Sequence, residues 1–155
     1  MLEDIFISER EKLGRKFNVE LVKLKGQTFY TDTEKFSKAI HTIFKQFNDD
    51  GRERYPNIIV KVDGDSTDEF IELKITQINS ASGCSAKVML EEIKDGHFTG
   101  IKENLTNLCD WSIESSHDGV NYKVNYLKSN NTKDIEDNLE YKPEGFTHVL
   151  RFYNK

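Results

Sequence analysis

Residues 31–47, TDTEKFSKAIHTIFKQF, decide the fold because they carry the strongest periodic pattern in the chain. Thr31 stands three residues before Glu34, a spacing typical of the capping box that begins a helix. Residues 48–51, NDDG, end the pattern. The apolar residues in between repeat at the three-and-four spacing of one helical face, at Phe36, Ala39, Ile40, Ile43, Phe44 and Phe47. The stretch therefore predicts an amphipathic helix with one buried face.

Alternating apolar and polar residues on either side of this helix predict extended segments. The expected strands are residues 17–24, 28–30, 58–62, 71–75, 120–126 and 145–153. Asp63-Gly64-Asp65 separates two of them and is typical of a turn, so we expect an antiparallel pair there. Asp118-Gly119 predicts a second turn before residue 120.

Weaker helical patterns flank these strands. Residues 2–13 and 86–93 carry apolar side chains at some helical positions. A second stripe begins near Phe98 and consists of Ile101, Leu105, Leu108 and Cys109. We therefore expect up to three further helices.

A mixture of helices and antiparallel strands indicates an α+β fold. We expect a two-layer sandwich in which helices 36–47 and 101–109 pack on one face of a mixed or antiparallel sheet. The other face is expected to be exposed and to offer a partner surface that contains Tyr122, Tyr126 and Phe152, because aromatic residues are enriched in interfaces.

Length and composition restrict the class of protein. The 155 residues are expected to form one domain, 1–155, in which the polar residues 128–143 are a mobile loop. A net charge of −5 argues against a nucleic-acid partner. Cys84 and Cys109 lack the spacing of a disulfide framework or zinc site, which is typical of reduced intracellular thiols. No apolar run has the length of a membrane span or the form of a signal peptide, so we expect a cytoplasmic protein without membrane contact.

The order helix, strand, strand, glycine-containing loop, helix, strand, strand resembles a known family. It is similar to the ATP-binding domain shared by sensor histidine kinases, gyrase and heat-shock chaperones, the Bergerat or GHKL fold, over residues 17–153. Residues 29–32 (FYTD) before residues 36–40 look like the aspartate-containing entry to the kinase N-box helix. Residues 107–111 (NLCDW) and 145–150 (GFTHVL) resemble its late helix and closing strand.

The resemblance implies a nucleotide site, and this chain departs from the family pattern at its main positions. The N-box helix of the family carries an Asn that holds Mg²⁺ against the phosphates, but the best register places Thr42 and Gln46 there. The family Asp that accepts the adenine amino group is replaced by Gln77. Gln77 is in phase with Ile71, Leu73 and Ile75, so we expect it to face inward.

The glycine boxes of the family have only a loose counterpart. Asn79 and Gly83 resemble the first box. Gly96 and Gly100 bracket three residues before the second helix, where a phosphate would meet helix-terminal amides. Together with Thr42, Gln46 and Gln77, these residues are the candidate nucleotide-binding set.

Two interpretations of this set remain open. In the first, the glutamines are hydrogen-bonded core residues, and the domain is a regulatory or protein-interaction module, a pseudoenzyme without catalytic residues, metal or cofactor, that binds a protein partner or itself. In the second, it is a weak ATP-binding protein or ATPase that uses Mg²⁺. No histidine stands in a two-helix phosphoacceptor hairpin, so we do not expect autophosphorylation.

A rival interpretation is a nuclease. Pro56-Asn57 followed by Glu72-Leu73-Lys74 resembles the PD-(D/E)xK motif, in which two carboxylates hold a divalent metal and the Lys polarises water. Asn57 stands where the first carboxylate belongs, although Asp63 can replace it. Alternating Glu and Lys also suit a solvated strand face. The two interpretations differ in strand phase: the histidine-kinase-like one requires Glu72 and Lys74 to face away from the helices and Gln77 to face toward them.

Overall fold

The computed structural model describes residues 2–14, 17–24, 32–51, 58–78, 99–105, 108–117, 119–125, 135–136, 139–143 and 146–153. The described helices are α1 (Leu2–Glu11), α2 (Thr33–Gly51) and α4 (Thr99–Leu105). The described strands are β1 (Phe17–Val22), β2 (Ile58–Ser66), β3 (Phe70–Gln77), β4 (Asp110–His117), β5 (Val120–Asn125), β6 (Ile135–Glu136) and β7 (Phe146–Tyr153).

The described strands form one mixed sheet in the order β1-β2-β3-β7-β4-β5-β6. β1 and β2 run parallel, and α2 makes the crossover that a parallel pair requires. The other neighbouring pairs are antiparallel. β7 lies in the centre of the sheet between β3 and β4, so the last strand in sequence joins the two halves.

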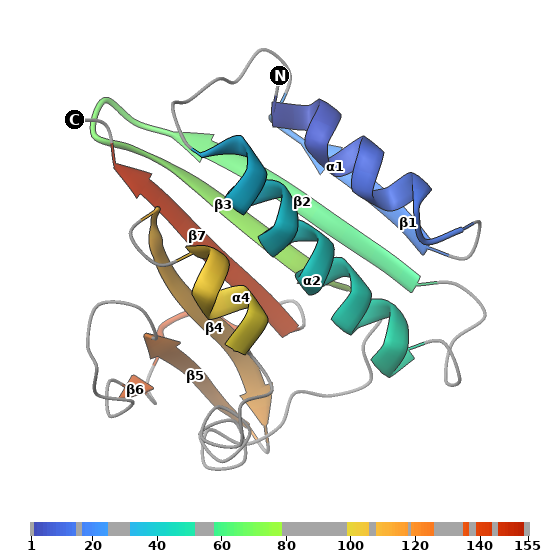
Figure 1. Ribbon diagram of the computed structural model, residues 1–155. Helices are drawn as coiled ribbons and strands as arrows, with labels where there is room; N and C mark the ends of the chain where they lie inside the picture. Colours follow the sequence, from blue (N-terminus) through green and yellow to red (C-terminus); the bar gives the residue numbers. More distant parts are fainter. Residues whose placement is uncertain are drawn as a thin grey trace.

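Figure 1 shows α1, α2 and α4 side by side on one face of the sheet, with α2 along its middle. This arrangement confirms the α+β sandwich with helices on one face. No helix among the described residues is long and apolar enough to cross a membrane.

The predicted stripe of α2 packs on the sheet as expected, and all six of its apolar residues are buried. The Phe36 ring meets Phe152 of β7 at 5.6 Å between centroids. Phe44 lies 5.1 Å from Phe17 of β1 and 6.1 Å from Phe6 of α1. Aromatic rings therefore join α1, α2 and the sheet into one core.

An aspartate caps α2. The Lys35 backbone N–H donates to Asp32 Oδ1 at 3.1 Å, as at a helix N-cap. Glu34 pairs with Lys38 one turn later, at 3.1 Å between Oε1 and Nζ. Thr31, the first residue of the expected capping box, lies outside the described residues.

The expected turn at residues 63–65 is wrong, because β2 continues to Ser66. The chain reverses after it, where the Thr67 N–H donates to the Phe70 carbonyl at 2.8 Å. Gly64 lies within the strand opposite Leu73, and a Cβ there would come within 2.4 Å of Leu24 Cδ2. The glycine therefore allows close packing against Leu24 rather than a turn.

The predicted aromatic partner surface is also wrong. Tyr122 and Phe152 are buried, at 1% and 5% exposure. The strand register explains the result. Phe152 stands opposite Ile71, which faces the core. Tyr122 is in phase with Val124, which stands opposite the core residue Ile113, so both aromatic side chains face the core. Tyr126 lies outside the described residues.

Other expectations differ at element ends or cannot be compared. The second helical stripe forms α4, but the helix ends at Leu105, before Leu108 and Cys109. β6 was not expected, and it lies within residues 128–143. The expected strand 28–30 and helix 86–93 lie outside the described residues.

Candidate functional site

Gln77 is the last residue of β3 and is only 5% exposed. In register it stands opposite Val60 of β2 and Phe146 of β7. It is in phase with Leu73 and Ile75, both fully buried. Gln77 therefore faces the helix layer, as its strand phase predicts.

Thr42 and Gln46 lie one turn apart on α2 and differ in their bonding. The Thr42 hydroxyl donates to the Lys38 carbonyl at 2.9 Å, a bond that stays within the helix. Gln46 is half-buried, and its Oε1 atom is buried with no hydrogen-bond partner in the part of the chain that the structure describes. Gln46 thus offers a buried acceptor, whereas the Thr42 hydroxyl is already bonded within the helix.

An aromatic contact places this part of α2 near Gln77. Phe47 follows Gln46 and meets the ring of Phe146, the cross-strand neighbour of Gln77, at 6.4 Å. The end of α2, the end of β3 and the start of β7 therefore meet at one corner of the core. Gly100 lies in the first turn of α4, which packs against α2. Asn79, Gly83 and Gly96 lie outside the described residues.

His148 is a core residue beside this corner that the sequence did not single out. It is completely buried, and its ring stacks on Trp111 at 5.8 Å and meets Phe47 at 5.6 Å. Trp111 Nε1 donates to His148 Nδ1 at 3.0 Å, so the proton of the neutral ring is on Nε2. Burial lowers the pKa of His148 to about 3. The imidazole is therefore neutral near pH 7, and the alternation of β7 is the sequence signal that places it inside.

The chemistry at this corner is that of amides and a neutral imidazole. Within the described ranges, no group of three or more His, Cys, Asp or Glu side chains has a geometry for a metal ion. Cys109 is a free thiol whose pKa is raised to about 12, mainly by burial and also by the charge of Asp110. The protonated thiol is a poor nucleophile.

Of the residues in the nuclease interpretation, Asp63, Glu72 and Lys74 lie on the opposite face of the sheet, which we call the outer face, and Pro56 and Asn57 lie outside the described residues. Asp63 stands directly across from Lys74, and Glu72 is in phase with Lys74. Glu72 Oε2 accepts two hydrogen bonds from Arg151, at 3.0 Å from Nε and 2.5 Å from Nη2. Its charge is thus compensated by a guanidinium. With Gln77 facing the helices, the strand phase favours the histidine-kinase-like interpretation.

Comparison with known proteins identifies a family. The comparison with curated proteins found no match. A family model described as "Histidine Kinase domain observed in conflict contexts" matches residues 1–153, which include α1 as well as the expected core of 17–153. With nearly the whole chain matched, the protein belongs to this family of histidine kinase domains.

Proposed function

We propose that this domain is a regulatory protein-interaction module that keeps the histidine kinase scaffold without catalysing phosphoryl transfer. The observation that carries the proposal is Gln77. It is buried and faces the helix layer, at the position where the family resemblance implies a carboxylate for the adenine amino group. An amide oxygen is a weaker acceptor than a carboxylate, so base recognition is weakened there.

The metal position supports the same proposal. Phosphoryl transfer depends on Mg²⁺ and on electrostatic stabilisation of the phosphates, and Mg²⁺ requires well-placed oxygen ligands. The resemblance implies an Asn on the N-box helix, where α2 has Thr42 and Gln46. The Thr42 hydroxyl already donates to the Lys38 carbonyl. Gln46 has a longer side chain than Asn, so its oxygen lies at a different distance from the helix axis.

The direct test combines a turnover assay with a binding assay. The protein is incubated with γ-labelled ATP and Mg²⁺, and phosphate release and protein labelling are followed. Melting temperatures are measured with ATP, ADP and Mg²⁺, because a ligand that binds only the folded state raises the melting temperature. We expect no turnover, no labelling and no shift. Turnover that disappears in Gln46→Ala would refute the proposal.

The second candidate function is nucleotide binding without efficient turnover. It is favoured by the buried Gln46 Oε1, which has no hydrogen-bond partner among the described residues and would be satisfied by a ligand N–H donor. This candidate predicts that nucleotide raises the melting temperature of the wild type and that Gln77→Leu abolishes the increase. Lys74→Gln, on the outer face of the same strand, is the matched control and retains it.

The proposed interaction has a measurement of its own. Sedimentation equilibrium over a range of protein concentrations distinguishes self-association from a heterologous partner. A mass that rises with concentration supports a homo-oligomeric module, and a constant monomer mass assigns the interaction to a different protein.

A further inference from the structure

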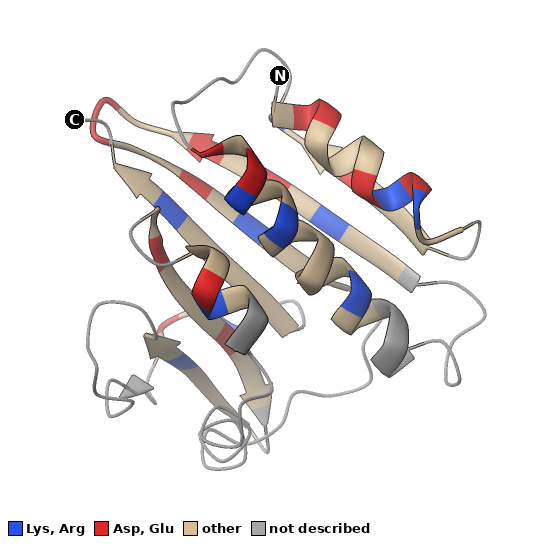
Figure 2. Cartoon of the chain, in the orientation of Figure 1, with Lys and Arg blue, Asp and Glu red and all other residues tan. Residues whose placement is uncertain are grey.

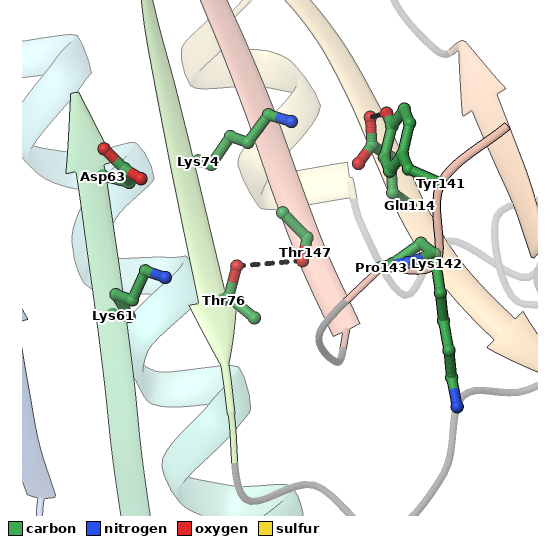
Figure 3. Close-up of a pocket in the computed structure, with 9 residues that line it drawn as sticks. All are labelled: Lys61, Asp63, Lys74, Thr76, Glu114, Tyr141, Lys142, Pro143 and Thr147. Atoms are coloured by element: carbon green, nitrogen blue, oxygen red, sulfur yellow. Dashed lines mark hydrogen bonds between the residues drawn. The ribbon is translucent and has the colours of Figure 1, made fainter. Parts of the chain in front are cut away.

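A pocket lined mainly by charged and hydroxyl-bearing residues lies on the outer face, away from the candidate nucleotide site. Its volume is about 250 Å³. β2, β3, β4 and β7 form its floor, and residues 141–143 line its other side (Figure 3). The floor side chains belong to Lys61, Asp63, Lys74, Thr76, Glu114 and Thr147.

The floor contains a row of side chains that cross-strand pairing holds in place. Lys61, Thr76, Thr147 and Glu114 stand directly opposite one another on four adjacent strands. The Thr76 and Thr147 hydroxyls share a hydrogen bond of 2.9 Å, and both side chains are buried. Glu114 is 3% exposed and accepts a hydrogen bond from the Tyr141 hydroxyl. The row is therefore ordered on one side by the sheet and on the other by Tyr141.

Opposite charges occupy neighbouring positions in this pocket. Asp63 stands across from Lys74 in register. Figure 2 shows basic and acidic residues along both β2 and β3. Lys74 extends toward Glu114 and Tyr141 (Figure 3), and its Nζ lies 5.1 Å from the centre of the Tyr141 ring. A cation held over a ring keeps N–H donors for other acceptors.

Asp63 is the residue whose bonding is incomplete. Its Oδ1 atom is buried and has no hydrogen-bond partner in the described part of the chain. A buried carboxylate oxygen without a donor is destabilising, and such groups in folded proteins call for a specific explanation. Asp63 lines the pocket with a half-buried side chain, so a ligand N–H donor in the pocket meets this carboxylate once it rotates about its Cβ–Cγ bond. A bound ammonium group would supply the missing hydrogen bond and an opposite charge.

We propose that this pocket binds a small zwitterion, with a primary ammonium group on Asp63 and a carboxylate or phosphate beside Lys61 and Lys74. The volume supports a ligand of amino-acid size, because pockets for drug-sized ligands measure roughly 300–1,000 Å³. The pocket contains both a carboxylate, at Asp63, and ammonium groups, at Lys61 and Lys74. A ligand with a single charge would compensate only one of these kinds, so the pocket selects against it. This site is on the other face from Gln77, so binding here is independent of the proposed function.

The test is an NMR titration of the ¹⁵N-labelled full chain with glycine, L-serine and phosphoethanolamine. Methylammonium and acetate serve as ligands with a single charge. We expect saturable shifts at the Thr76 and Thr147 amides with at least one zwitterion, in the millimolar range or below, and much weaker effects of the single-charge ligands. ATP is expected not to compete. Comparing the affinities for glycine and serine with the affinity for phosphoethanolamine shows whether the pocket prefers a carboxylate or a phosphate.

Matched variants assign the binding to Asp63. Asp63→Asn is expected to weaken zwitterion binding by about tenfold or more, the usual effect of losing a charge-assisted hydrogen bond. Asp65→Asn, on the same face of β2 and exposed, is expected to leave binding unchanged. Without ligand, Asp63→Asn should not lower the melting temperature, because Asp63 Oδ1 makes no hydrogen bond within the described residues that the substitution could break. Lys74→Met tests the acidic end of the ligand.

Three results would overturn the proposal. The first is that none of the zwitterions produces saturable shifts at the pocket amides. The second is equal binding to wild type and Asp63→Asn. The third is a marked loss of stability in Asp63→Asn without ligand, which would assign Asp63 a structural role instead.

Discussion

Truncation of Phe44 tests the packing of the helix layer on the sheet. The Phe44 side chain is fully buried, and its ring meets Phe17 of β1 and Phe6 of α1. Phe44→Ala removes both aromatic contacts and leaves a cavity where three elements meet. Such truncations cost about 3–5 kcal/mol in free energy of unfolding. With a urea m-value of about 2 kcal/mol per molar, the midpoint of unfolding should fall by about 1.5–2.5 M.

Urea unfolding followed by circular dichroism measures this effect. Ile7→Ala is the control, because Ile7 is an apolar residue of α1 that is 42% exposed. Its substitution should change stability by no more than about 0.5 kcal/mol. A loss below about 1 kcal/mol for Phe44→Ala would mean that α2 does not pack on the sheet as described.

Two further predictions concern buried contacts. The pKa of His148 is about 3 in the fold, so between pH 6.5 and pH 3 only the unfolded chain binds this proton. The free energy of unfolding should therefore fall as the pH drops through this window, by up to about 1.4 kcal/mol per pH unit. In urea unfolding, His148→Gln should show a shallower pH dependence of this free energy than the wild type. Equal pH dependence in the two proteins would contradict the burial of His148. Gly64→Ala should cost about 1–3 kcal/mol through its clash with Leu24, and less in a Leu24→Ala background. Strictly additive losses in this double-mutant cycle would show that the two sites are not coupled.

Periodicity was enough to predict the elements that bury the most surface. The stripe of α2 repeats over three turns, and β2, β3 and β7 alternate over several residues, so each position reinforces the next. The inward phase of Gln77 followed from the same alternation. The two-residue strand β6 has too few positions for a pattern to be visible.

The errors have physical causes that a local pattern does not contain. Asp63-Gly64-Asp65 has the composition of a turn, but the glycine is required by the tertiary contact with Leu24. Tyr122 and Phe152 were placed on the outer face because alternation separates two faces without saying which one the helices cover. Their phase with Val124 and Leu150, which are both fully buried, gives the correct face.

The outer pocket was not predictable because its parts meet only in the folded sheet. Thr76 and Thr147 are 71 residues apart, and they become neighbours because the last strand inserts between β3 and β4. A strand order of this kind depends on the whole sheet and leaves no local signal in β7. Asp63 and Lys74 were singled out in the sequence, but as a metal carboxylate and the water-polarising lysine of the nuclease pattern.

Family membership and the proposed lack of catalysis are compatible because they depend on different residues. The fold rests on many apolar positions, each of which contributes a part of the core and tolerates similar side chains. Phosphoryl transfer depends on a few polar atoms placed to a fraction of an ångström. The α2 stripe keeps its apolar face, while Thr42 and Gln46 on the same helix stand where the resemblance to the Bergerat fold implies a metal-binding Asn. Selection for a binding function would preserve the apolar residues that maintain the fold. It would leave the polar residues needed for phosphoryl transfer free to change.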